Sequence, residues 1–348
     1  MAFGRVLATA LIGGVLGCGG ADKEREQTLL NGGSVQLIAA PEGVTFHDPA
    51  WFATTNEIMF TLAPPGDSPR DQISAVRIDG TGVRRLPLPA DRRPACNTTT
   101  QTSPTPLPDG RLAYVAVCWG DVAAGTATRL LAFDPKAHRV ERLVRYSLPF
   151  QSGPTAWSPD AESAIILNLR GLYEQLEWLT ADGLRPVGLP LARAGAPAWS
   201  PDGQLIAVPG VAGDAGEGIS RLDAPWKLFL FRPRSTRLRG LADGLTSVGR
   251  ISVAWSPNSK WLAAVYTPER ENRGELWLID VANERRWLLL RGQFSGLTWL
   301  PGKRLAVAVG ALSMYPESYP EKTDVGLYIV TLPDLNALPP PATADARA

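Results

Sequence analysis

Residues 197–208 read Pro197-Ala198-Trp199-Ser200-Pro201-Asp202-Gly203-Gln204-Leu205-Ile206-Ala207-Val208. In the Ser-Pro-Asp-Gly part, proline fixes φ, aspartate bonds its own backbone and glycine accepts a positive φ, which together favour a tight turn. The apolar run after the turn has the composition of a buried strand. The segment therefore predicts a strand that ends near Trp199, a short turn, and a second strand.

The same segment recurs along the chain. Two close copies are Thr155-Ala156-Trp157-Ser158-Pro159-Asp160 and Val253-Ala254-Trp255-Ser256-Pro257-Asn258, and weaker copies are Leu297-Thr298-Trp299-Leu300-Pro301-Gly302, Pro49-Ala50-Trp51-Phe52 and Pro104-Thr105-Pro106-Leu107-Pro108-Asp109-Gly110. The anchors stand at positions 51, 106, 157, 199, 255 and 299, with Pro106 in the tryptophan slot, and are 42 to 56 residues apart. This is the period of a four-stranded propeller blade, so six repeats predict six blades.

The second half of each repeat also has a common pattern. An apolar run such as Lys227–Phe231 or Glu275–Asp280 follows the first two strands, and in five repeats a turn and a further short strand come next. The sixth run, Gly326–Val330, instead meets Leu332-Pro333-Asp334, so its fourth strand is missing. Residues Val35–Ala39 precede the first anchor without a blade of their own. We expect them to complete the last blade and close the ring, which protects a sheet edge.

The repeat resembles the TolB-type β-propeller repeat family, which is WD-repeat-like in architecture but lacks the Trp-Asp dipeptide. The resemblance covers about residues 35–332 and implies an all-β, six-bladed propeller. TolB proteins carry a separate α/β domain before the propeller, whereas only about 17 residues separate Cys18 from the first predicted strand. The contacts of TolB with its lipoprotein and colicin partners are therefore not transferred to this chain.

The tryptophan anchors are interpreted as structural. A tryptophan before each turn has the bulk to fill the wedge between neighbouring blades, and we expect core packing rather than ligand stacking. Truncation to alanine at 157, 199 or 255 is predicted to cost about 3–5 kcal/mol through cavity formation. The five anchors of this kind are Trp51, Trp157, Trp199, Trp255 and Trp299.

The N-terminal residues predict export. Arg5 precedes an apolar run from Val6 to Leu16 that is too short to span a membrane and has the form of a secretory signal. Val15-Leu16-Gly17-Cys18 resembles the bacterial lipobox, in which the cysteine becomes the lipidated first residue; the alternative is an ordinary signal peptide with a free Cys18. We expect a signal peptide over residues 1–17, a lipidated tether over 18–34, the propeller over 35–335 and a disordered tail over 336–348. Gly19 after the lipidated cysteine favours the outer membrane in a Gram-negative cell.

Charge and composition exclude several classes of function. The 35 Lys and Arg nearly balance 34 Asp and Glu, which leaves no basic field for nucleic acid, and 45% hydrophobic residues are too many for a disordered chain. Membrane attachment would therefore depend on the Cys18 lipid. The balance also means that partner recognition would come from local side chains.

The chain contains little that suggests catalysis. His47 and His138 are the two histidines, neither has a partner histidine, and no paired-cysteine zinc motif or Gly-x-Ser-x-Gly nucleophile elbow is present. We predict no catalytic residue, no metal ligand and no cofactor. The alternative is a calcium-dependent propeller hydrolase or lactonase with ligands drawn from Asp48, Asn97 or Asn168, although no spacing selects them.

Cys96 and Cys118 are placed at one end of a predicted hairpin in the second blade. In an exported protein this position favours a disulfide between them, and two buried free thiols are the alternative.

The predicted strand connections differ between the two faces of the propeller. Those between first and second and between third and fourth strands are short, whereas the others are long, over 64–71, 89–103, 119–127, 209–225, 267–274 and 310–324. Long loops on a rigid scaffold commonly carry binding. The candidate contacts there are Trp119, Asp121, Glu269, Arg270, Arg273, Tyr315 and Tyr319.

These observations predict a monomeric, lipid-anchored propeller of the bacterial cell envelope. Its expected role is a non-catalytic scaffold for an envelope protein partner, with a glycan as a second class of ligand. A structural lipoprotein is a further alternative to the hydrolase.

Overall fold

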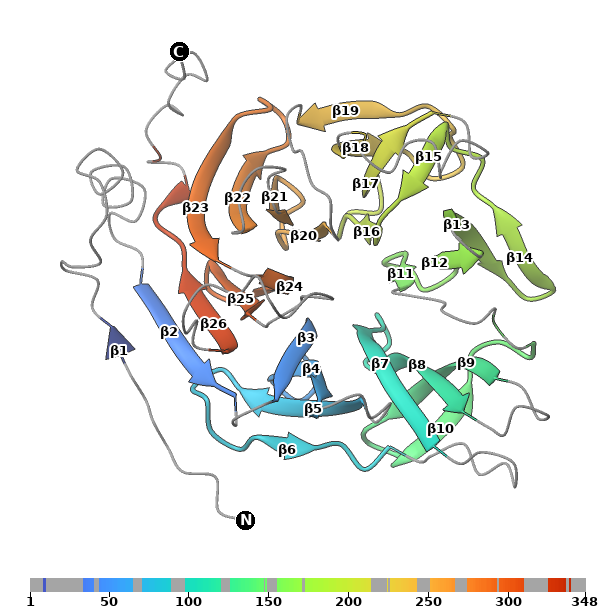
Figure 1. The fold of residues 1–348 in the computed structure, drawn as a ribbon, viewed down its shortest axis with the longest axis horizontal. Coiled ribbons are helices and arrows are strands. Elements are labelled where there is room, and N and C mark those ends of the chain that lie inside the picture. Colours follow the sequence, from blue (N-terminus) through green and yellow to red (C-terminus); the bar gives the residue numbers. More distant parts are fainter. Residues whose placement is uncertain are drawn as a thin grey trace.

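The computed structural model describes residues 9–10, 34–40, 44–64, 71–88, 98–119, 126–146, 148, 155–170, 173–213, 224, 226–242, 251–266, 274–292, 294–309, 325–335 and 338. Its regular elements are strands, arranged as six antiparallel sheets around a common centre (Figure 1). Among the described residues there is no helix that is long and apolar enough to cross a membrane. The predicted all-β, six-bladed propeller is confirmed.

Five blades follow the chain in order, from the innermost strand to the outermost. Blade 1 is β3 (Thr45–Phe52), β4 (Glu57–Ala63), β5 (Gln72–Arg77) and β6 (Arg84–Arg85); blade 2 is β7 (Thr98–Pro106), β8 (Leu112–Trp119), β9 (Thr126–Asp134) and β10 (Arg139–Arg142). Blade 3 is β11 (Thr155–Trp157), β12 (Ala164–Arg170), β13 (Tyr173–Thr180) and β14 (Gly183–Pro186). Blade 4 is β15 (Leu191–Ala194), β16 (Ala198–Trp199), β17 (Ile206–Ala212), β18 (Lys227–Phe231) and β19 (Arg239–Ala242); blade 5 is β20 (Ser252–Trp255), β21 (Trp261–Tyr266), β22 (Gly274–Asp280) and β23 (Arg286–Gly292).

Blade 6 closes the ring with strands from both ends of the chain. It consists of β24 (Phe294–Leu300), β25 (Arg304–Val309), β26 (Gly326–Thr331), β2 (Ser34–Ala39) and, outside β2, the two-residue strand β1 (Thr9–Ala10). Strand β2 pairs antiparallel with β26 along its whole length, from Ser34 opposite Thr331 to Ala39 opposite Gly326. The predicted closure by Val35–Ala39 is therefore present, whereas β1 lies inside the predicted signal peptide.

The repeated turn is stabilised by its serine. In blade 4 the Ser200 hydroxyl donates to Asp202 Oδ1 at 2.6 Å and accepts the backbone N–H of Leu205 at 2.9 Å. Blade 3 repeats both bonds with Ser158, and blade 5 repeats them with Ser256 and Asn258. These bonds satisfy backbone groups that the tight turn would leave unpaired, which explains why the sequence repeats here.

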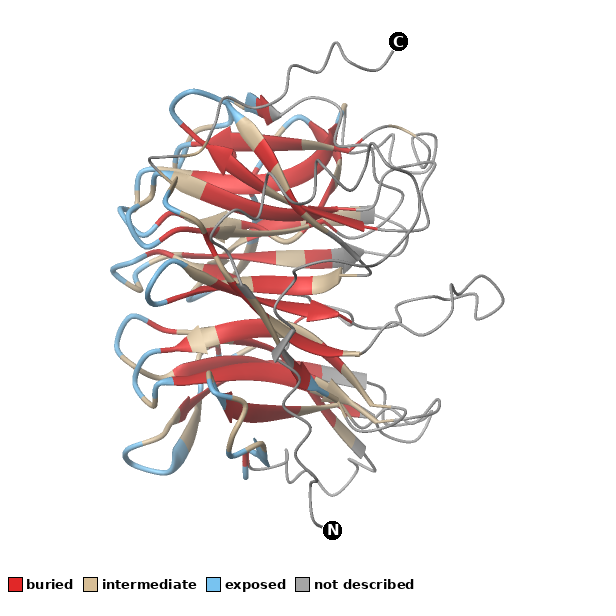
Figure 2. Ribbon diagram, turned by 90° about the vertical axis from the view of Figure 1, so that its left-hand side faces the viewer, coloured by how far each residue is buried: buried red, intermediate tan, exposed pale blue. Residues whose placement is uncertain are grey.

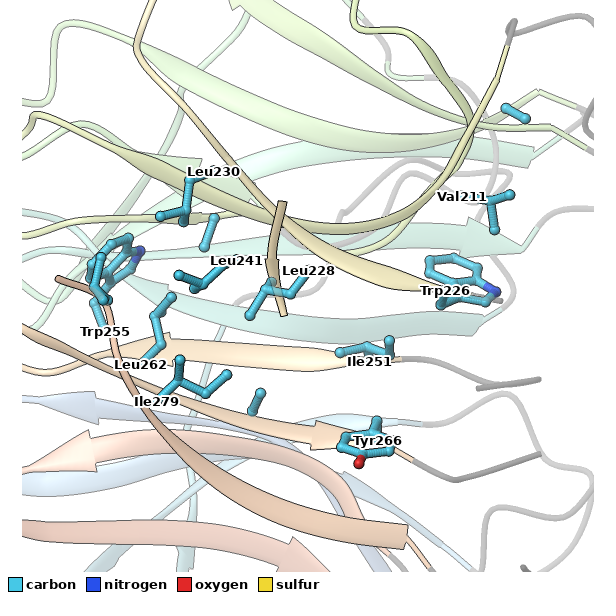
Figure 3. Close-up of a cluster of buried hydrophobic side chains, with 14 residues drawn as sticks. Val211, Trp226, Leu228, Leu230, Leu241, Ile251, Trp255, Leu262, Tyr266 and Ile279 are labelled. Atoms are coloured by element: carbon cyan, nitrogen blue, oxygen red, sulfur yellow. The ribbon is translucent and has the colours of Figure 1, made fainter. Parts of the chain in front are cut away.

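The core is divided among the interfaces between blades. Apolar side chains of neighbouring sheets form buried clusters at all six interfaces, and Figure 3 shows the one between blades 4 and 5. In β2, Val35 packs into the cluster between blades 5 and 6, and Ile38 packs into the one between blades 6 and 1. Leu335 and Leu338 also pack against the first of these clusters, so propeller contacts extend past residue 335.

Each tryptophan anchor lies at the interface with the preceding blade. Trp255 and Trp299 are buried, and their indole N–H groups donate to Ala198 O and Ala254 O of the preceding innermost strand, both at 2.9 Å. Trp51, Trp157 and Trp199 are half-buried. Trp255 and Trp299 therefore join neighbouring blades by hydrogen bonds as well as by packing.

Candidate binding face

The two faces of the propeller differ in how the strands are connected. One face, which we call the turn face, carries the connections between first and second and between third and fourth strands, such as 158–163 and 134–139; they form a row of exposed turns in Figure 2. The opposite face, which we call the loop face, carries the connections between second and third strands and between blades. Its second-to-third connections run from 63 to 72 in blade 1, 119 to 126 in blade 2, 212 to 227 in blade 4 and 309 to 326 in blade 6.

The contact residues predicted from the sequence belong to the loop face. Trp119 is the last residue of β8, but its side chain is outside the described part of the structure. Six others, all outside the described residues, are Asp121, Glu269, Arg270, Arg273, Tyr315 and Tyr319. The connections that contain them follow β8, β21 and β25, so these predictions stand as they were made.

Described side chains at the same face form a group that the sequence did not single out. Glu174 is the second residue of β13 and accepts two bonds from the Arg193 guanidinium, from Nε at 3.1 Å and from an Nη at 3.0 Å. The Arg193 guanidinium also lies 5.0 Å from the centre of the Trp226 ring, just before β18. Both ionic side chains are only about a fifth exposed. We call Glu174, Arg193 and Trp226 the blade 3–4 rim.

Irregular backbone at the start of blade 4 explains how Arg193 reaches this position. The innermost strand is divided into β15 and β16, and its pairing with β17 shifts between Leu191 and Arg193. The Trp226 ring covers Gly195, where an added Cβ would lie 3.3 Å from Cζ3 of the indole. An arginine inside an otherwise apolar innermost strand is the sequence signal that could have marked this rim.

A second aromatic group lies next to it, at the loop-face end of the cluster between blades 4 and 5. Tyr266 ends β21 opposite Glu275, whose carboxylate accepts the Trp277 indole N–H at 2.8 Å. Tyr266 and Trp277 stack with their ring centres 6.2 Å apart. Burial and the Glu275 carboxylate raise the pKa of Tyr266, so it stays neutral. In Figure 3, Trp226 and Tyr266 lie at the end of the cluster opposite Trp255.

The innermost strands of blades 1, 2 and 6 contain β-bulges. The pairing shifts between His47 and Ala50, between Thr102 and Thr105, and between Phe294 and Gly296. Asp48 and Ser103 have positive φ values of 47° and 55°, and each precedes a proline. Gly296 permits the close approach of blade 1, because an added Cβ would lie 2.9 Å from Pro49 Cδ. Bulges and left-handed non-glycine residues are enriched near functional sites.

The two histidines lie in different parts of the propeller. His47 is in β3, and its Nε2 is 2.8 Å from Thr45 Oγ1. His138 is in the turn between β9 and β10, on the turn face, and its ring makes a T-shaped contact with Phe133. Asp71 lies at the loop face, where burial raises the pKa of its side-chain carboxyl. The backbone carbonyl of Asp71 accepts the Gln101 N–H at 2.8 Å. His47, His138 and Asp71 therefore lie in three separate places, the innermost strand of blade 1, the turn face and the loop face.

The calcium ligands suggested by the sequence do not come together in the described residues. Asp48 is on the innermost strand of blade 1, whereas Asn168 is on the second strand of blade 3 and is fully buried. Its amide donates to Glu177 Oε2 at 2.5 Å, and Asn97 is outside the described residues. In the described part of the chain, no group of three or more His, Cys, Asp or Glu could hold a metal ion. Because Asn97 is outside the described residues, the calcium alternative stays a prediction.

Cys118, one of the two cysteines of the predicted disulfide, lies at the loop-face end of β8. Cys118 lies one residue before the end of β8, opposite Thr99 of β7, and is disulfide-bonded. Cys96 and Cys18 are outside the described residues. The pairing with Cys96 therefore remains a prediction.

A hollow of about 350 Å³ lies on the turn face of blade 2, lined by Arg111, Asp134, Ala137, Arg139 and Glu141. Most of its charged groups are bonded to one another, and Asp134 accepts the backbone N–H groups of Lys136 and Ala137. Arg111 pairs with both Asp109 and Glu141, and Arg139 pairs with Glu141 at 2.9 Å. The hydrogen bond from Arg111 lowers the pKa of Asp109. This arrangement fits a solvated charge network that links two turns.

Comparisons with solved structures give the same architecture. A gluconolactonase from Xanthomonas campestris matches with a TM-score of 0.56 and 16% identity, over 88% of this chain and 92% of that one. The fold is that of a six-bladed β-propeller. TolB from Acinetobacter baumannii matches with a TM-score of 0.48 and 17% identity, over 69% of this chain and 53% of that one, so the chain spans about half the length of TolB.

An oligogalacturonate lyase in complex with manganese matches with a TM-score of 0.48 and 13% identity, over 87% of this chain and 94% of that one. No protein-family model and no curated protein matches the sequence. At sequence identities this low, similarity to a solved structure supports a shared fold and says nothing about function.

Proposed function

We propose that this propeller is a non-catalytic binding scaffold, anchored by a lipid on Cys18 in the bacterial cell envelope, that recognises a protein partner through its loop face. The observation that carries the proposal is the blade 3–4 rim. Arginine is among the residue types that most often dominate protein interfaces, and here the ion pair with Glu174 and the buried Trp226 ring hold the partly exposed Arg193 in place. Side chains that are already ordered lose less entropy on binding.

The rest of the proposal comes from the sequence. The lipobox-like Val15–Cys18 segment supports lipid anchoring, and the apolar run before it supports export. A balanced net charge supports recognition by local contacts over long-range steering.

Site-specific photo-crosslinking in cells tests which face binds. Crosslinkers at Trp119, Glu174 and Tyr315 on the loop face are compared with crosslinkers at Lys136 and Arg139 on the turn face. We expect partner adducts from the first set and none from the second, identified by mass spectrometry. Adducts that form only from the turn face would contradict the proposal.

A matched pair of variants tests the rim itself. Arg193→Ala removes a guanidinium held between Glu174 and Trp226, whereas Arg139→Ala removes one that is paired with Glu141 on the turn face. We expect Arg193→Ala to weaken binding to a crosslinked partner by roughly 10-fold or more, as for a central arginine contact. Arg139→Ala should leave it unchanged. Thermal unfolding of both variants checks that the loss is not due to unfolding.

Calcium addition tests the hydrolase alternative. Since the candidate ligands do not come together, we expect purified protein to contain no stoichiometric calcium and its melting temperature to stay constant on calcium addition. Elemental analysis and a calcium titration by differential scanning fluorimetry measure this. A saturable rise in melting temperature would favour the hydrolase instead.

A further inference from the structure

The outer strands of five blades share a feature that the sixth lacks. Every one of these five outermost strands carries at least one arginine. They are β6 with Arg84 and Arg85, β10 with Arg139 and Arg142, β14 with Arg185 and Pro186, β19 with Arg239, and β23 with Arg286 and Arg291. Charged residues and proline on an edge strand are the usual protection against pairing with another chain.

Strand β2 is the outermost full strand of blade 6 and reads Ser34-Val35-Gln36-Leu37-Ile38-Ala39. It contains no charged residue and no proline. It is longer than four of the five protected outer strands. Its side chains are fixed in the ring because Val35 and Ile38 pack into two different interface clusters, and a fixed register keeps the backbone edge extended.

An additional strand pairs with this edge in the full chain. Strand β1 lies outside β2 in the same sheet, antiparallel, with Thr9 opposite Gln36 and Ala10 opposite Val35 (Figure 1). The segment around it, Leu7-Ala8-Thr9-Ala10-Leu11, is uncharged. The edge is therefore able to accept an extended, uncharged segment, and the segment that occupies it belongs to the predicted signal peptide.

We infer that the outer edge of β2 is a docking edge for an extended, uncharged segment of a partner protein, which adds to blade 6 as an antiparallel strand. This inference rests on the proposed function, because removal of residues 1–17 during export is what vacates the edge. Backbone hydrogen bonds supply the affinity in this mode of recognition, and alternate side chains supply specificity. Before removal, β1 holds the edge closed.

Hydrogen exchange measures whether the edge opens. The full-length chain, made by cell-free synthesis, is compared with the processed chain extracted from cell membranes. Of Val35 and Gln36, we expect the one whose N–H faces β1 to exchange roughly 10-fold faster in the processed chain, because an edge strand without a partner exposes its backbone, whereas the N–H that faces β26 stays protected. Equal exchange rates would overturn the inference.

A peptide of residues 7–13 then tests strand addition. Added to the processed chain, this peptide should restore the protection of β2, whereas the same peptide with Thr9→Pro should not, because proline removes a backbone donor. In the protein, Gln36→Arg introduces the charge found on the other outer strands and should weaken peptide binding by about 10-fold. Gln36→Met is the matched uncharged control and should bind like the wild type. Equal binding by both peptides or by both variants would contradict strand addition.

Failure of processing is separable from failure of docking. The mass of the purified N-terminus reports whether residues 1–17 are removed and Cys18 is lipidated. A full-length Thr9→Pro variant releases β1 without processing, so the same peptide titration applies to it. A processed protein that sediments as a dimer, and becomes monomeric with Gln36→Arg, would assign the edge to a second copy and overturn the partner proposal.

Discussion

At the scale of single residues, the serine of each repeated turn contributes more than its small size suggests. Ser200 is fully buried, donates to Asp202 and accepts from the Leu205 backbone. The Ser200 bond lowers the pKa of Asp202, and a hydrogen bond from Ser158 lowers the pKa of Asp160 in the same way. The turn therefore links a buried hydroxyl to a surface carboxylate.

Replacing this serine should have a cost that depends on pH. We expect Ser200→Ala to cost about 1–3 kcal/mol at pH 7, because it leaves the half-buried Leu205 N–H without its acceptor. The pKa of Asp202 is lower in the folded state than in the unfolded state, where it is near 4. The Ser200–Asp202 bond therefore stabilises the fold at pH values above the unfolded pKa, and this stabilisation is lost as the pH falls through the folded-state pKa. The penalty should shrink between pH 5 and about 3, measured by urea denaturation.

Blade 5 provides the control for this prediction. Ser256 makes the same bond to Asn258, which does not titrate, at 2.7 Å. The penalty of Ser256→Ala should therefore have no matching dependence on pH over this range. A parallel pH dependence of both variants would show that Asp202 is not its source.

The turn also contains a backbone strain that one substitution relieves. Ala161 has a φ of 59° at the position that Gly203 occupies with 75°. A left-handed alanine is less favourable than glycine by about 1 kcal/mol, so Ala161→Gly should raise the free energy of unfolding by roughly that amount. Chemical denaturation measures the gain. Gly203→Ala is the reverse control and should lower stability.

At the scale of strands and blades, the tryptophan anchors act as crosslinks between innermost strands. The Trp255 indole bonds to Ala198 O, one residue before the anchor of the preceding blade, and Trp299 repeats this contact with Ala254 O. The Trp199 indole bonds instead to Gly203 O of its own turn, at 3.3 Å. The same repeat position therefore makes two kinds of contact.

This difference separates the packing of the anchor from its hydrogen bond. Trp255→Phe keeps an aromatic ring but removes the donor to blade 4, and we expect it to cost at least about 1 kcal/mol, the net value of one hydrogen bond. Trp255→Ala should cost about 3–5 kcal/mol, because it also leaves a cavity. Guanidinium denaturation of the two variants measures both. A Trp255→Phe variant as stable as the wild type would show that the hydrogen bond adds nothing.

The repeats made the blades predictable, whereas the irregularities were not. Turn chemistry and spacing located each anchor, and Val35–Ala39 was recognised as a strand without a blade. The left-handed backbone at Asp48 and Ser103 had no glycine to mark it. The rim formed by Glu174, Arg193 and Trp226 joins two blades, and contacts between blades depend on local bulges that single-sequence patterns do not encode.

At the scale of the whole molecule, stability depends on the closure of the ring. Strand β2 connects the last blade to the first, because Ile38 packs among side chains of both. Closure leaves no gap between blades 6 and 1, where Ser295 also donates to Phe46 O at 2.8 Å. A defect in β2 therefore weakens two interfaces together.

A single substitution measures the strength of this closure. Ile38→Ala should cost about 2–5 kcal/mol, the range for a buried isoleucine, because its side chain is 6% exposed. Ala39→Ser, at the exposed neighbouring position, should change stability by less than about 0.5 kcal/mol. Thermal and urea unfolding measure both. An Ile38→Ala variant as stable as the wild type would show that β2 contributes little to the ring.

The pairing of β2 with β26 also sets an order of events during synthesis. Ser34 is made early but cannot meet Thr331 until nearly the whole chain has left the ribosome. Contacts between residues so far apart in sequence form late and slow the folding of β-rich proteins. The five complete blades can form their hairpins as they emerge, whereas the last blade must wait for a strand made at the beginning. A stalled or prematurely terminated chain would consequently keep the uncharged strand β2 without β26, which makes the synthesis of β26 a checkpoint for solubility.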